Sequence, residues 1–148
     1  MYDFVDRPVT TLDPGGRFLV WSMRRWVKAM GDRQCPAQAV GAAFAKWDMI
    51  AGLQPFLRIM ALFNFHGLET FGFCQLQCNH ISEHEAIILN LVCSLRDCRP
   101  EIVRDTAALL VEEDHVGDLI ASLSALGRTM DNAAIYPART AWTSGAQR

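Results

Sequence analysis

The sequence predicts an all-α fold, a single-domain bundle of five or six helices around an apolar central helix at about residues 83–97. Three observations lead to this prediction. Apolar residues recur at three-and-four spacing in most segments, glycine and proline separate these segments, and a capping box precedes the central one. The chain has 148 residues, the usual size of one domain, and its 51% of hydrophobic residues can fill a core and leave apolar surface for a partner.

The pattern divides the chain into an N-terminal arm at 1–16, a helical bundle at 17–130 and a flexible C-terminal tail at 131–148. Four residues interrupt regular structure in the arm: Pro8, Pro14, Gly15 and Gly16. Trp142 lies in the polar tail, where a role at an interface fits better than a role in the core.

Three helices are expected in the first half of the bundle, at about 17–30, 37–50 and 55–66. The first has one apolar face, made of Leu19, Met23, Trp26, Val27 and Met30. In the second, the small residues around Gly41–Ala45 would let a neighbouring helix or a second copy of the chain approach closely. The third is apolar around almost its whole circumference and is expected to be central. Residues 69–78 alternate weakly and are interpreted as a connector or a short strand.

The strongest local signal is a capping box, in which Ser82 accepts from the amide of Glu85 and the glutamate reaches back. The helix that follows has no charge between Glu85 and Arg96, so it is expected in the core. A fifth helix begins at Pro100, and a sixth spans about 114–130. The fifth is expected to bury one face: Ile102, Val103, Thr106, Leu109 and Leu110.

Charge and composition disfavour several classes of function. The net charge is −2, so bulk attraction to nucleic acid or to an anionic membrane is not expected. No apolar stretch approaches the roughly 20 residues needed to cross a bilayer, and the first fifteen residues do not have the pattern of a signal peptide. Five cysteines, an odd number, fit a reducing compartment such as the cytoplasm. No nucleophile-elbow, zinc-protease or phosphate-loop motif is present, and an enzyme is not expected.

A cluster between residues 74 and 98 is the main candidate for chemistry. It holds Cys74, Cys78, His80, His84, Cys93 and Cys98. Cys74, Cys78, His80 and His84 are candidate zinc ligands, although their spacing lacks the usual two-residue knuckle. Cys93 lies about 14 Å along the helix from His84 and cannot join them. It is interpreted as a core residue, and Cys98 as a helix-end residue.

The same cysteines have other interpretations. No Cys74–Cys78 disulfide is expected, because an extended segment would separate the α-carbons by about 13 Å. A reactive thiol at Cys78 stays open as an interpretation, because a helix N-terminus lowers a nearby thiol's pKa.

The two other histidines have structural interpretations. His66 is interpreted as a C-terminal helix residue, and His115, after Glu112, as part of a solvated helix start. No cofactor is required, and zinc is the one considered.

The first helix suggests a partner surface. Arg17, Arg24, Arg25 and Lys28 are expected on its outer face, with two tryptophans interleaved, and could contact an acidic protein. Nucleic acid is disfavoured, because the following helix offers mainly alanine, phenylalanine and Lys46 in place of base-reading side chains.

The segment Cys78-x-x-Ile81-Ser82-x-x-Glu85, which leads into an apolar helix after a basic first helix with tryptophans, resembles a group of small bacterial helical proteins of unassigned function. The resemblance covers the first helix and residues 78–130, and it implies an all-helical fold and a bacterial cytoplasmic setting. We therefore expect a non-enzymatic protein-binding or regulatory module, with a protein partner or self-association. The alternative is a metal- or thiol-dependent protein that uses Cys78, His80 and His84.

Overall fold

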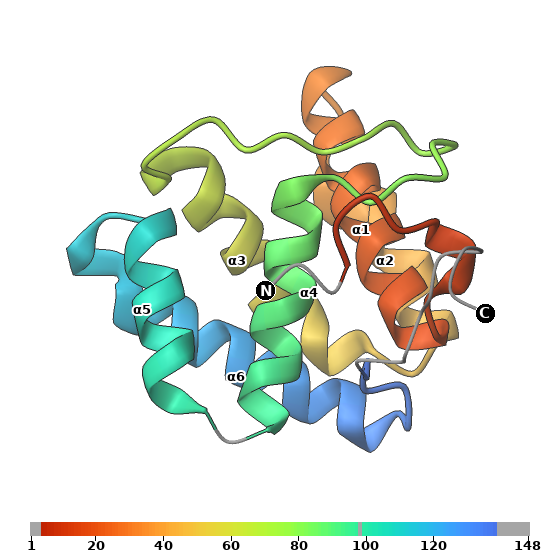
Figure 1. Ribbon diagram of the computed structural model, residues 1–148. Coiled ribbons are helices and arrows are strands. Elements are labelled where there is room, and N and C mark those ends of the chain that lie inside the picture. The colour runs from red at the N-terminus through yellow and green to blue at the C-terminus, as the bar shows by residue number, and fades with distance from the viewer. Residues whose placement is uncertain (1–3, 98, 139–148) are drawn as a thin grey trace.

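A computed structural model describes residues 4–97 and 99–138 (Figure 1). Cys98 and Trp142, both assigned roles from the sequence, lie outside the described residues. The described part contains six α-helices: α1 (Pro14–Gly31), α2 (Pro36–Lys46), α3 (Leu53–His66), α4 (Glu83–Arg96), α5 (Pro100–Leu110) and α6 (Val116–Asn132). It contains three short 3-10 helices, at Val9–Thr11, Ile50–Gly52 and Glu113–His115, and no strand. The predicted all-α fold is confirmed.

The central position of α4 is also confirmed (Figure 1). Nine of its 14 residues are buried, on more than one side of the helix. The predicted capping box is present, because the Ser82 hydroxyl accepts from the Glu85 amide and Glu85 Oε1 accepts from the Ser82 amide at 2.9 Å. The helix therefore begins where the sequence predicts.

The start of α1 differs from the prediction. The helix begins at Pro14 and not at Arg17. Pro14, Gly15 and Gly16, which the sequence pattern predicts to interrupt regular structure, form its first turn. Asp13 caps the helix by accepting from the Gly16 amide at 2.8 Å, and proline is favoured at the first helical position. Gly15 is required for packing, since a Cβ there would lie 1.7 Å from the carbonyl oxygen of Ile135.

The N-terminal arm is docked on the bundle. Phe4 is buried, and the Asp6 amide donates to the carbonyl of Ile81 at 2.9 Å. The Ile81 amide in turn donates to the carbonyl of Arg7, so the arm pairs with the segment that precedes α4. At the other end, residues 133–138 are also packed, and the Tyr136 hydroxyl donates to the α4 carbonyl of Val92 at 2.6 Å.

Three predicted faces need correction. The buried face of α5 uses Ala107 in place of Ile102 and Leu109, and the Leu109 side chain is 70% exposed. In α1, Val27 and Met30 are each over a third exposed and line a cavity beside the connector. A Cβ at Gly41 would meet nothing within 4 Å, so no described helix approaches α2 closely at this glycine, although Ala43 and Phe44 of the same stretch pack against the core.

The connector between α3 and α4 is neither helix nor strand over residues 69–78. None of the described helices combines the length and the apolar character needed to span a bilayer.

A matched pair of glycine substitutions tests this packing. Gly15→Ala should destabilise the fold by about 1–3 kcal/mol, because the new Cβ overlaps the backbone of Ile135. Gly41→Ala should stabilise it by up to about 1 kcal/mol, because its Cβ enters open space and alanine favours the helix. Urea denaturation measures both changes, and equal effects of the same sign would contradict the assigned packing.

Candidate functional site

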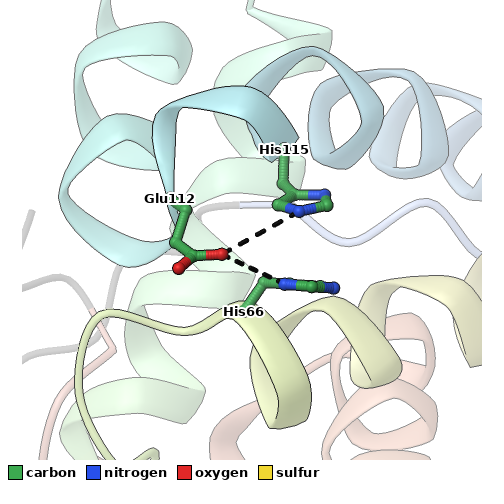
Figure 2. A group of neighbouring side chains, drawn as sticks. All are labelled: His66, Glu112 and His115. Carbon is green, nitrogen blue, oxygen red and sulfur yellow. Dashed lines mark hydrogen bonds and ion pairs between the residues drawn. The ribbon is translucent and has the colours of Figure 1, made fainter.

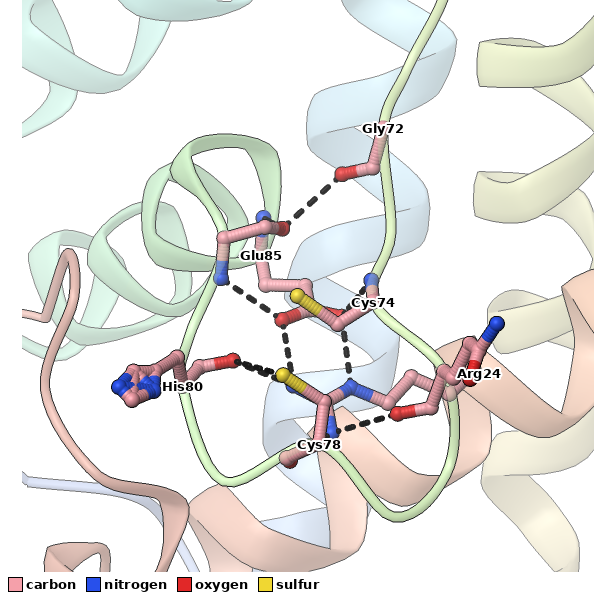
Figure 3. Close-up of polar contacts among 8 residues, drawn as sticks. Arg24, Gly72, Cys74, Cys78, His80 and Glu85 are labelled. Carbon is pink, nitrogen blue, oxygen red and sulfur yellow. Dashed lines mark hydrogen bonds and ion pairs between the residues drawn. The ribbon is translucent and has the colours of Figure 1, made fainter.

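A buried ion pair joins α1 to α4 beneath the connector (Figure 3). Arg24 is 3% exposed and Glu85 is 0% exposed. The guanidinium binds the carboxylate in bidentate fashion, with Nε donating to Oε2 at 2.8 Å and Nη2 donating to Oε1 at 3.0 Å. Burial lowers the pKa of Arg24, but the hydrogen bonds and the charge of Glu85 more than compensate, so its pKa is raised and the guanidinium stays charged.

The remaining N–H groups of Arg24 bind backbone carbonyls of the connector. Nη1 donates to Gln75 at 3.0 Å and to Cys78 at 2.6 Å, and Nη2 donates to His80 at 2.8 Å. All five guanidinium N–H groups therefore have acceptors. Glu85 also accepts from the Cys74 amide, so the pair fixes the connector from two sides.

This geometry corrects one expected partner contact. Arg24 was expected on the outer face of the first helix, but the connector covers it and takes all its donors. Arg17 is exposed and donates to the backbone of the arm. Arg25 is half-buried, and Lys28 is exposed and paired with Asp32 at 3.1 Å.

The two connector cysteines are close together. The Cys78 amide donates to the carbonyl of Gln75, so the segment turns back, and the assumption of an extended segment about 13 Å long was wrong. Both thiols are free. Burial, hydrogen bonding with Cys78 and the charge of Glu85 raise the pKa of Cys74 to about 11. Cys74 is therefore a protonated thiol at neutral pH.

The two histidines of the predicted zinc set do not converge with these thiols. His84 Nδ1 accepts from the Gly72 amide at 2.7 Å, and its Nε2 lies 2.7 Å from Glu69 Oε1. Both ring nitrogens are thus engaged, which leaves none for a metal. The His80 ring points away from both sulfur atoms (Figure 3), and its carbonyl binds Arg24. Cys74, Cys78, His80 and His84 do not form a ligand set in this arrangement.

A different cluster lies where α3 ends and where α5 leads into α6 (Figure 2). Glu112 Oε1 is 3.1 Å from His66 Nδ1 and 3.9 Å from His115 Nε2. The two imidazole rings are stacked, with centroids 3.7 Å apart. Within the described residues, this is the one group of three histidine, cysteine or acidic side chains whose ligand atoms all lie within 4.8 Å of one another. No sequence pattern indicates this cluster, because His66 and Glu112 are 46 positions apart in the chain.

A groove lies between α1 and α2. We call it the tryptophan groove and define it by Leu12, Arg17, Phe18, Trp21, Lys46 and Trp47; its volume is about 610 Å³. Trp21 is 37% exposed and Trp47 is 42% exposed. The Phe18 ring lies at its base, 6.1 Å from the Trp47 ring and 4.9 Å from that of Phe44.

Comparisons with protein-family models, with curated proteins and with solved structures found no match to this chain.

The Arg24–Glu85 pair should dominate the stability of the fold. Arg24→Ala leaves a buried carboxylate and three carbonyls without their donor, so we expect a loss of about 3–5 kcal/mol in the free energy of unfolding. Arg25→Ala on the same helix is the matched control and should change it by no more than about 0.5 kcal/mol. Urea denaturation compares the two variants. Similar losses in the free energy of unfolding would show that the buried pair contributes no more to stability than a half-buried arginine on the same helix.

The raised pKa of Cys74 predicts an unreactive thiol. A pKa of about 11, against an ordinary value of 9.0, leaves about 100-fold less thiolate at pH 8. Mass mapping after iodoacetamide treatment should therefore find the exposed Cys35 modified well before Cys74.

The same shift has a consequence for stability. Folding favours the protonated thiol, so this contribution is present below pH 9 and is lost as the pH rises through about 11. Cys74→Ser should remove that part of the alkaline destabilisation, as measured by urea denaturation at a series of pH values.

Fast labelling of Cys74 in the folded protein would contradict the raised pKa on which both predictions rest.

Proposed function

We propose that the protein is a non-enzymatic binding module that recognises an acidic segment of a partner protein in the tryptophan groove. The observation that carries the proposal is the pairing of two half-exposed tryptophans with two cations, Arg17 and Lys46. Among the described residues, neither cation forms an ion pair with a carboxylate. No described carboxylate neutralises either charge, so both can attract an acidic ligand, although Arg17 also donates to the carbonyls of Thr10 and Leu12.

The apolar part of the groove supports binding of a bulky side chain. Tryptophan is enriched among the residues that dominate the energy of protein interfaces, because it buries a large area at a small entropic cost. The groove volume of about 610 Å³ lies in the usual range for binding pockets. Phe44 and Phe18 pack beneath the groove, so its base is a firm part of the core.

The electrostatics favour a carboxylate over a cation. Arg17 lies in the first turns of α1, where the helix dipole also places positive potential. Asp13, the nearest acid in the sequence, has its oxygens bound to the amides of Gly16 and Ala138. An acidic residue beside an aromatic or branched side chain matches both properties of the groove.

The proposal keeps the sequence-based expectation of a regulatory role in the bacterial cytoplasm, and it changes the residues involved. Arg17 and the interleaved Trp21 stay in the partner surface, Trp47 and Lys46 join it, and Arg24 leaves it. Self-association, through the same groove or through the small-residue face of α2, is the competing outcome of the test below.

Selection from a random-peptide display library on the folded full-length chain tests the proposal without a known partner. We expect the enriched peptides to carry Asp or Glu next to an aromatic or branched residue. Trp21→Ala and Lys46→Glu should each weaken the best synthetic peptide at least tenfold, roughly 1.4 kcal/mol or more. Fluorescence polarisation measures the affinity, which should fall as salt is raised.

Arg104→Glu, an exposed charge reversal on α5, is the matched control and should leave the affinity unchanged. Enriched peptides without acidic residues, or a peptide affinity that Lys46→Glu leaves unchanged, would overturn the proposal. Sedimentation velocity separates the competing outcome: a dimer that Trp21→Ala dissociates would make a second copy the occupant of the groove.

A further inference from the structure

We infer that His66, Glu112 and His115 form a binding site for a divalent transition-metal ion of the Zn²⁺ or Co²⁺ type. This site is separate from the tryptophan groove, and no sequence motif pointed to it. Two imidazole nitrogens and one carboxylate oxygen are a donor set that zinc and cobalt accept readily, whereas Mg²⁺ and Ca²⁺ prefer oxygen alone.

The distances between the donor atoms are close to those of a coordinated set. Bonds of about 2.1 Å at tetrahedral angles separate two ligand atoms by about 3.4 Å. The distances from Glu112 Oε1 to the two histidine nitrogens, 3.1 Å and 3.9 Å, lie on either side of this value. Once the imidazole rings have turned toward the ion, shifts of a few tenths of an ångström in these two distances would equalise them.

The backbone holds the three side chains together. The Glu112 amide donates to the carbonyl of His66 at 3.1 Å, and the His115 amide donates to the carbonyl of Glu112 at 2.9 Å. Next to His66, Gly67 permits a close approach, because a Cβ there would lie 2.5 Å from the carbonyl oxygen of Phe63. The relative position of the three α-carbons is thus set before any ion binds.

The rings must reorient to coordinate one ion. Imidazole lone pairs lie in the ring plane, so two rings stacked face to face cannot both direct a lone pair at one point. The side chains have room for this rotation, since His66 is 39% exposed, Glu112 is 58% exposed and His115 is 28% exposed. This exposure also leaves space for water or another ligand to complete a four-coordinate ion.

The surrounding charge favours a cation. Glu113 and Asp114 lie in the same 3-10 turn as His115, and Asp118 follows in the first turn of α6. Arg58 of α3 pairs with Asp118 and offsets that one carboxylate. An ion at this corner would therefore sit among more negative than positive charge.

Titration of the chelator-treated full-length protein with Co²⁺ and Zn²⁺ tests the inference. Calorimetry should give one site per chain, and visible absorption of Co²⁺ should report four-coordination. His66→Gln, Glu112→Gln and His115→Gln should each weaken binding by roughly 100-fold or more, because even outer-shell changes cost about 10–100-fold. Acidification should weaken binding, because protons compete for the imidazoles.

His80→Gln removes an exposed histidine outside the cluster and is the matched control, and Cys74→Ser with Cys78→Ser removes the competing thiols. Both controls should bind normally. Long-range ¹H–¹⁵N spectra should show ring-nitrogen shifts at His66 and His115, and none at His80 or His84. Absence of binding at micromolar metal, or binding lost with the cysteines and kept without His66, would overturn the inference. Circular dichroism of each variant separates loss of the site from loss of the fold.

Discussion

The buried pair of Arg24 and Glu85 is the interaction on which the rest of this structure depends. Two charges removed from water are costly unless every donor and acceptor finds a partner, and here the partners come from three separate parts of the chain. The pair therefore forms only when α1, α4 and the connector are all in place. A misplaced connector would leave N–H groups of Arg24 and an oxygen of Glu85 buried without a partner, so the pair disfavours other arrangements of these three segments.

One residue serves two purposes at this point. Glu85 completes the capping box with Ser82 and also holds the guanidinium of Arg24. The start of the central helix is thus coupled to the first helix. The connector begins directly after His66, at the end of α3, and leads to this point at the start of α4. The backbone that carries His66 is therefore continuous with the segment that Arg24 and Glu85 bind.

Local patterns predicted much of the fold, while the sites depend on long-range contacts. Ser82 and Glu85 are three residues apart, so the capping box was visible in the sequence, but Arg24 lies 61 residues from Glu85 and its burial was not. The N-terminal prolines and glycines were interpreted as breakers, although Gly15 is needed because residue 135 passes against it. The sequence assigns His66 and His115 to two separate helix ends, since only the tertiary fold brings those ends together.

The capping of α1 has a consequence for biosynthesis. Asp13 accepts from Gly16 with one oxygen and from the amide of Ala138 with the other, so an early and a late residue share one carboxylate. A chain that leaves the ribosome from its N-terminus makes the first contact at once and the second only after about 125 further residues. The first turn of α1 is therefore synthesised well before Ala138, yet its N-terminal end completes its packing only after residue 138 has been made.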